Sequence, residues 1–112
     1  MVRSASPGSA ADPRSEIPLR RAATVMLLRD TAAGLEVFVL RRVTGMAFAA
    51  GMTVFPGGAV DTADDAAPLA WVGPDAIWWA ERLGVSARDA ASLVVAAVRE
   101  LFEETGVLLA GP

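Results

Sequence analysis

The sequence predicts an α/β fold, because two apolar strand segments come before a long amphipathic helix. Residues 22–29 are an apolar run and residues 35–42 are a second one, rich in Val and Phe. Residues 30–34 lie between them, beginning with Asp and ending with Gly, which is turn chemistry typical of a β-hairpin. The helix is expected from Ser86 to about Thr105, where apolar residues recur at the spacing of one helical face. Strands of this kind followed by a helix indicate the α/β class.

Weaker local signals place the elements between the hairpin and the helices. Residues 43–52 have a loop-like composition, and residues 53–55 form a short β-type segment. This segment continues into Pro56-Gly57-Gly58, which is a strong turn signal. Residues 62–67 are polar, so we expect them to be exposed. The run 22–29, by contrast, is expected to form a buried strand.

Helix-terminating residues mark out two helices in the second half of the chain. A short helix is expected to start at Pro74-Asp75 and to end before Gly84. The long helix is expected to begin at Ser86, which stands three residues before Asp89 at capping-box spacing, and to end at Gly106. Residues 107–110 are expected to start another strand. The buried stripe of the long helix is expected to consist of Val94, Ala97, Val98 and Leu101.

The composition narrows the chemistry that the chain can perform. It contains no Cys and no His, and all ten basic residues are Arg. These absences exclude thiol chemistry, Ser-His-Asp catalysis, the usual zinc sites and a lysine-dependent phosphate loop. Carboxylates remain, and they suit a hard cation such as Mg²⁺ or Mn²⁺. The net charge of −3 argues against nucleic acid as a partner.

The first 21 residues are expected to be a disordered tail, since they are rich in Ser, Ala, Pro and Arg and show no apolar period. A secretory signal is not expected, because the tail lacks a continuous apolar segment. No later stretch reaches the roughly 18 apolar residues that a membrane span needs. We therefore expect a cytoplasmic protein with no membrane partner.

An acidic cluster near the end of the long helix is the strongest candidate site. Glu100, Glu103 and Glu104 are spaced i, i+3 and i+4, which puts their carboxylates on one helical face. They lie beside the negative end of the helix dipole, where each costs about 0.3–1 kcal/mol. A bound divalent cation would offset this unfavourable energy, and the positive charge of Arg99 would help. The alternative is a solvated acidic helix end with no ligand.

Residues 99–107 read R-E-L-F-E-E-T-G-V and match the second half of the Nudix box, R-E-U-x-E-E-x-G-U, where U is aliphatic. Gly58 and Asp64 match the first half, G-x5-E, with Asp in place of Glu. The chain thus resembles the Nudix hydrolase family, with an insertion inside the box at about residues 65–91. Because Asp is shorter than Glu, the role of Asp64 is left open.

The stretch Thr53–Asp61 (TVFPGGAVD) and the segment Leu40-Arg41-Arg42 resemble the coenzyme A diphosphatase branch of this family, the type called Nudix motif 19. The resemblance implies an α/β/α sandwich with a mixed sheet. Residues 22–112 would be the N-terminal part of this domain, and the fold would be incomplete at the C-terminus. The expectation is a C-terminally truncated domain.

The resemblance also implies a function. Nudix enzymes use Mg²⁺, or Mn²⁺, to hydrolyse a nucleoside diphosphate linked to another moiety, which here would be coenzyme A or acyl-CoA. The implied metal ligands are Glu100, Glu103 and Glu104. Glu103 or Glu104 would also activate water, and Arg99 would hold the carboxylates in place. The implied substrate-binding residues are Arg41, Arg42, Gly57 and Gly58.

Several alternatives remain open at this point. The chain could be an inactive Nudix fragment that only binds metal or oligomerises, for instance as a homodimer, or an unrelated interaction domain. Arg41 and Arg42 could instead be solvated charges at a strand end. The Trp residues of the insertion, Trp71, Trp78 and Trp79, could stack on a substrate base or pack the insertion onto the core.

Overall fold

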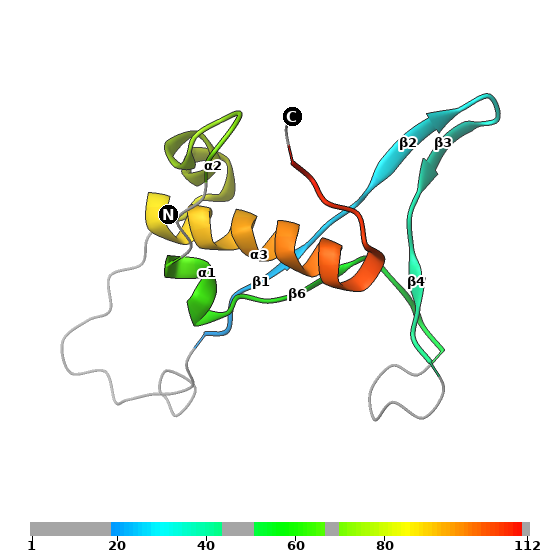
Figure 1. Ribbon diagram of the computed structural model, residues 1–112, viewed down its shortest axis with the longest axis horizontal. Coiled ribbons are helices and arrows are strands. Elements are labelled where there is room, and N and C mark those ends of the chain that lie inside the picture. The colour runs from blue at the N-terminus through cyan, green and yellow to red at the C-terminus, as the bar shows by residue number, and fades with distance from the viewer. Residues whose placement is uncertain (1–18, 44–50, 67–69, 111–112) are drawn as a thin grey trace, which may run out of the picture.

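A computed structural model describes residues 19–43, 51–66 and 70–110 of the 112-residue chain. Short strands form the first half of this part and helices the second, so the predicted α/β class is confirmed (Figure 1). The elements are β1 (Ala22–Thr24), β2 (Leu28–Thr31), β3 (Gly34–Val37), β4 (Leu40–Arg41), β5 (Thr53–Val54), β6 (Gly57–Ala59), α1 (Thr62–Ala66), α2 (Ala76–Leu83) and α3 (Ala87–Thr105).

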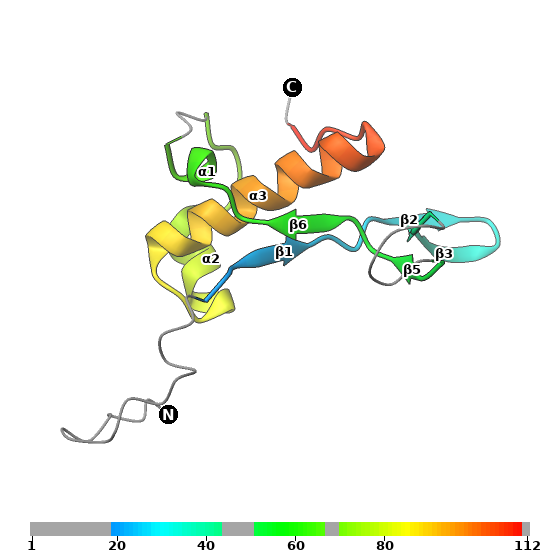
Figure 2. The same cartoon turned by 90° about the horizontal axis from the view of Figure 1, so that it is seen from below.

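The strands form three antiparallel pairs, β1–β6, β2–β3 and β4–β5. Backbone hydrogen bonds extend two of these pairs by one residue. Val25 N–H donates to the Pro56 carbonyl at 2.8 Å beside β1–β6, and Phe38 N–H donates to the Leu27 carbonyl at 2.9 Å beside β2–β3. The three pairs are separate two-stranded sheets, and the β2–β3 hairpin projects away from the helices (Figures 1 and 2). All pairings within the described residues are antiparallel, so the parallel pairs of a mixed sheet are not found in this part of the chain.

Both longer helices begin and end where the capping residues predict. The Asp75 carboxylate accepts from Trp78 N–H at 2.9 Å, and the Ser86 hydroxyl accepts from Asp89 N–H at 3.1 Å. Gly84 and Gly106 follow the last turns with φ of 69° and 78°, a left-handed conformation that glycine adopts without strain. These boundaries confirm the predictions for α2 and α3.

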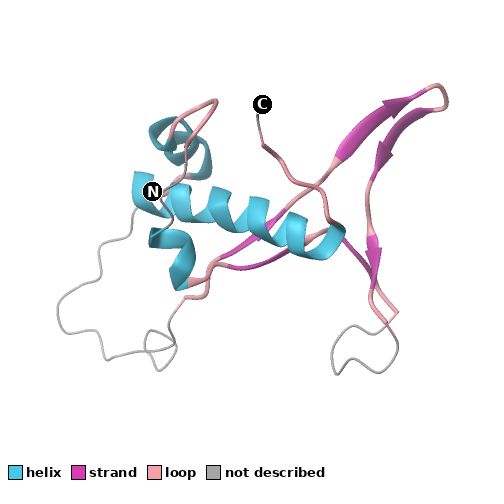
Figure 3. Cartoon of the chain, viewed as in Figure 1, coloured by secondary structure: helices cyan, strands magenta, loops and turns pink. Residues whose placement is uncertain are grey.

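The buried stripe predicted for α3 is largely wrong. Of its four members only Leu101 is buried, and the other three are half-buried. The other buried positions of the helix are Ala90, Ser92 and Ala96. The reason is that α3 lies across the β1–β6 ribbon and also contacts α1 and α2 (Figures 2 and 3). It therefore buries parts of two sides instead of one continuous stripe.

Three further expectations are corrected. Residues 62–67 were expected to be exposed, and Thr62, Ala63 and Asp65 are, but Thr62–Ala66 form α1 and the side chain of Asp64 is buried. Residues 107–110 form no strand, since no described segment pairs with them. The run 22–29 is not a buried strand, because Met26 and Leu28 are 59% and 50% exposed. No helix contacts the β2–β3 hairpin within the described residues, so nothing there covers it.

The described helices do not include one that is both long and apolar enough to cross a membrane. The predicted tail, residues 1–21, lies almost wholly outside the described residues.

Candidate functional site

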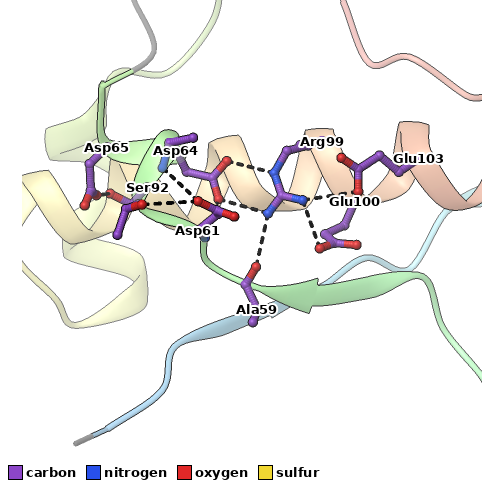
Figure 4. Close-up of polar contacts among 10 residues, drawn as sticks. Ala59, Asp61, Asp64, Asp65, Ser92, Arg99, Glu100 and Glu103 are labelled. Carbon is purple, nitrogen blue, oxygen red and sulfur yellow. Dashed lines mark hydrogen bonds and ion pairs between the residues drawn. The ribbon is translucent and has the colours of Figure 1, made fainter.

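Arg99, on the second-last turn of α3, is the centre of a polar cluster that joins α3, α1 and β6 (Figure 4). Its Nε and Nη2 donate to the two carboxylate oxygens of Asp64 at 2.8 and 3.0 Å. Nη2 also donates to the carbonyl of Ala59 at 3.1 Å. This bidentate geometry fixes the plane of the guanidinium group. Arg99 thereby ties the helix to the end of β6 and to α1.

Asp64 holds Arg99 from a buried position in α1. Its side chain is 2% exposed, and Asp61 N–H donates to its Oδ2 at 2.7 Å. The hydrogen bonds from Arg99 hold the pKa of Asp64 below its ordinary value, although burial acts in the opposite direction. The same contacts raise the pKa of Arg99. Both partners therefore remain charged, and the role that the sequence left open for Asp64 is to anchor Arg99.

The opposite edge of the Arg99 guanidinium faces the acidic residues of α3. Nη1 donates to Glu100 Oε1 at 3.0 Å and to Glu103 Oε2 at 3.3 Å. Two of the three predicted metal ligands thus converge on one nitrogen atom. Glu104 is exposed and is not among the acceptors that Arg99 contacts. The helix accordingly offers two carboxylates held by Arg99 and a third that is exposed.

Gly57 and Gly58 lie in β6, not in the turn that the sequence suggested, and they pair with Thr24 and Ala23. A Cβ on Gly57 would overlap the carbonyl oxygen of Ala23. A Cβ on Gly58 would lie 2.5 Å from both Cδ and Oε1 of Glu100. Gly57 therefore requires glycine because backbone atoms approach it closely, whereas at Gly58 a side chain would have to move. At Gly58 the neighbouring group is the carboxylate of a predicted metal ligand.

The donor set of the cluster fits Mg²⁺ or Mn²⁺, which prefer carboxylate oxygens. Glu100 is mostly buried at 17% exposure, while Glu103 is 54% exposed and accessible to solvent. In the arrangement of the described residues, no three acidic side chains lie close enough together to form a metal site. The structure thus brings two of the three predicted metal ligands, Glu100 and Glu103, to one guanidinium group and does not group Glu104 with them.

The two arginines at the end of β4 differ in their surroundings. Arg41 is exposed, whereas Arg42 is partly buried and lines a cavity of about 480 Å³. Gly57 and Gly58 line the same cavity. Three of the four predicted substrate-binding residues therefore line the same cavity. Arg41 is not among the described residues that line it.

The aromatic residues of the region predicted to be an insertion lie mainly on α2. The rings of Trp78 and Trp79 meet edge to face with centroids 4.9 Å apart, and the Arg82 guanidinium lies 3.5 Å from the centroid of Trp78. The helix that carries them contacts α3. This contact favours the interpretation in which α2 packs the region onto the core.

Comparison with protein-family models gave no match for this chain. Among solved structures, the chain is similar to the crystal structure of a Nudix hydrolase from Alicyclobacillus acidocaldarius. The two share 35% sequence identity with a TM-score of 0.58, over 85% of this chain and 40% of the other. The chain therefore spans two-fifths of the length of that hydrolase. The match confirms a Nudix-like fold and supports assignment to the Nudix family.

Proposed function

We propose that this chain carries the metal site of a hydrolase that splits a nucleoside diphosphate from another moiety, with Mg²⁺ or Mn²⁺ as the cofactor. The observation that carries the proposal is the arrangement around Arg99, which holds Glu100 and Glu103 together beside Gly58. Similarity to a Nudix hydrolase at 35% identity supports it.

The electrostatics of the helix end support a cation at this position. Three carboxylates in the last two turns of α3 lie beside the negative end of the helix dipole. The single guanidinium group of Arg99 is already shared with Asp64. The cluster therefore has an excess of negative charge, which a divalent cation would neutralise.

In the proposed mechanism, the bound metal ion would neutralise the diphosphate and act as a Lewis acid on it. The residues of the chain do the positioning. Asp64 fixes Arg99, and Arg99 holds Glu100 and Glu103 in place through its hydrogen bonds. Glu103 or Glu104 would accept a proton from the attacking water, since both are exposed. Water would then add to one phosphorus, and the bridging oxygen would leave with the other phosphate.

We propose coenzyme A or acyl-CoA as the substrate, on the resemblance of Thr53–Asp61 and Leu40-Arg41-Arg42 to coenzyme A diphosphatases. A second candidate is a non-catalytic module that binds metal or forms a homodimer. The exposed apolar residues of the β2–β3 hairpin, including Leu35 at 67% exposure, favour this candidate.

Thermal unfolding with and without millimolar Mg²⁺ or Mn²⁺ tests the metal site. Glu103→Gln removes one charge from the cluster, and Glu36→Gln removes one from the exposed hairpin as a matched control. We expect the metal to raise the Tm of the wild type and of Glu36→Gln, but not that of Glu103→Gln, because a ligand stabilises the state that binds it. No metal effect on the wild type would contradict the proposal.

Hydrolysis separates the two candidate functions. The wild type is incubated with Mg²⁺ and either coenzyme A or ADP-ribose, and nucleotide products are separated by chromatography. Product that depends on both metal and Glu103 supports the hydrolase. Stabilisation by metal without product supports the non-catalytic module. Cleavage of ADP-ribose but not of coenzyme A would retain the hydrolase and reject the coenzyme A substrate.

A further inference from the structure

Helix α1 depends on α3 for its position. It has five residues, Thr62–Ala66, and among the described elements it contacts α3 alone. A helix this short is not stable by itself, because its few backbone hydrogen bonds do not offset the entropy lost on ordering it. Its contacts with α3 therefore also decide the position of Asp64, the residue of α1 that anchors Arg99.

A second polar contact joins the two helices beside the first. The Ser92 hydroxyl donates to Oδ1 of Asp65, the residue that follows Asp64 (Figure 4). Ser92 is 2% exposed. A serine inside a helix can instead donate to the carbonyl four residues earlier, and the Arg88 carbonyl lies 3.1 Å from Ser92 Oγ. The hydroxyl has one proton, and the charged carboxylate is the stronger acceptor, so the contact with Asp65 is favoured.

The two contacts hold α1 at separate points on one face of α3. Ser92, Ala96 and Arg99 are spaced i, i+4 and i+7, and Ala96 between the two contacts is completely buried. Seven residues of helix are about two turns, or roughly 10 Å. With the Asp64–Arg99 contact alone, α1 could rotate about that point. The contact between Ser92 and Asp65 removes this freedom, so it also fixes the direction from which Asp64 meets Arg99.

We propose that Ser92 is a positioning residue of the acidic cluster, which acts through α1 on the Asp64–Arg99 pair. Arg99 in turn holds Glu100 and Glu103. The identification of this cluster as a metal site rests on the function proposed above. The effect of Ser92 on Arg99 requires neither metal nor hydrolysis, so the two proposals are separable by experiment.

Hydrogen exchange of the Arg99 Nε–H, measured by NMR in EDTA, tests the proposal. Ser92→Ala removes the hydroxyl that donates to Asp65. Ser86→Ala is the matched control, because it removes another serine hydroxyl from the same helix, the one that accepts from Asp89 N–H. We expect exchange to become about tenfold or more faster in Ser92→Ala, as for the loss of a hydrogen bond to a charged group, and to change by less than about twofold in Ser86→Ala. An unchanged rate in Ser92→Ala, or equal increases in both variants, would overturn the proposal.

A double-mutant cycle tests whether Ser92 acts through Asp65. Asp65 is exposed, so Asp65→Ala is expected to fold, and it should accelerate exchange of the Arg99 Nε–H as much as Ser92→Ala does. The double variant should show no further increase, because both changes break the same contact. Effects that multiply in the double variant would show two independent contributions and would overturn the proposal.

Metal binding connects this contact to the proposed function. In calorimetric titrations with Mn²⁺, Ser92→Ala is expected to bind about tenfold more weakly than the wild type, the lower end of the effect of residues that orient metal ligands. Ser86→Ala should bind like the wild type, and equal affinities of Ser92→Ala and the wild type would overturn the proposal. If the wild type binds no Mn²⁺ while the exchange of Arg99 still responds to Ser92→Ala, the proposed hydrolase is rejected and the positioning of Arg99 by Ser92 stands.

Discussion

The α3 region and the β2–β3 hairpin use similar apolar side chains but cover them to different extents. In α3, Ala90, Ala96 and Leu101 are completely buried. In the hairpin, Leu28 and Leu35 are 50% and 67% exposed. The helix contacts α1, α2, β1 and β6, whereas β2 and β3 contact each other and no further element among those described. Packing around one helix therefore supplies the core of the described fold.

The ion pairs of the two regions show the same contrast. Arg29 and Glu36 pair across the hairpin at 3.1 Å with exposures of 76% and 50%. Arg99 and Asp64 pair at 2.8 Å with exposures of 28% and 2%. Solvent weakens the first pair, while the second is bidentate and shielded. An ion pair of the same type should therefore contribute measurably to the free energy of unfolding near α3 and almost nothing to it in the hairpin.

Replacing Leu101 with Ala is expected to have the largest effect on stability. This side chain is completely buried, so its truncation leaves a cavity and should lower the free energy of unfolding by about 3–4 kcal/mol. Leu35→Ala, in the exposed hairpin, should change it by less than about 0.5 kcal/mol. Urea denaturation followed by circular dichroism measures both. Similar losses in the two variants would show that the hairpin is part of the core.

Replacing Asp64 with Asn is expected to have the next largest effect. The change leaves the mostly buried Arg99 without its main counterion, and should lower the free energy of unfolding by about 2–3 kcal/mol. Glu36→Gln removes the corresponding charge in the hairpin and should change it by no more than about 0.5 kcal/mol. The same urea experiment compares them. An Asp64→Asn variant as stable as Glu36→Gln would remove the distinction between the two pairs.

The pH dependence of stability follows from the lowered pKa of Asp64. Because the carboxyl is more acidic in the folded chain, its contribution is complete above the ordinary pKa of 3.8 and is lost as the pH falls through the lowered value. The wild type should therefore lose stability over this acidic range more steeply than Asp64→Asn. Thermal melts at decreasing pH measure the two slopes. Parallel slopes would contradict a role for Asp64 in this loss.

Replacing Gly58 with Ala should affect the site more than the fold. The added Cβ would meet the flexible end of Glu100, so the cost to stability should be only about 1 kcal/mol. Displacing that carboxylate should nevertheless reduce the Tm increase that Mg²⁺ produces. Gly34→Ala, in the hairpin, is the comparison, since nothing lies within 4 Å of its added Cβ, although its φ of +120° introduces strain. An unchanged metal response in Gly58→Ala would show that Glu100 does not hold the metal.

The sequence by itself determined the two longer helices, α2 and α3, and the spacing of the acidic cluster. Ser86 and Gly106 cap α3 through hydrogen bonds to residues three and four positions away, Asp89 and Phe102. Such contacts are local, and the residue types that make them can be read directly from the chain. The position of Glu100 and Glu103 on one face follows from helical geometry in the same way.

Only the tertiary structure decided what these residues contact. Asp64 and Arg99 are 35 positions apart, and nothing in the sequence between them specifies that one anchors the other. Gly58 meets Glu100 because β6 packs against α3, and Arg42 lines the same cavity as residues of β1, β5 and β6. The uncovered hairpin was missed for the same reason. Whether an apolar strand is buried depends on which distant segment covers it, and residue type alone does not state this.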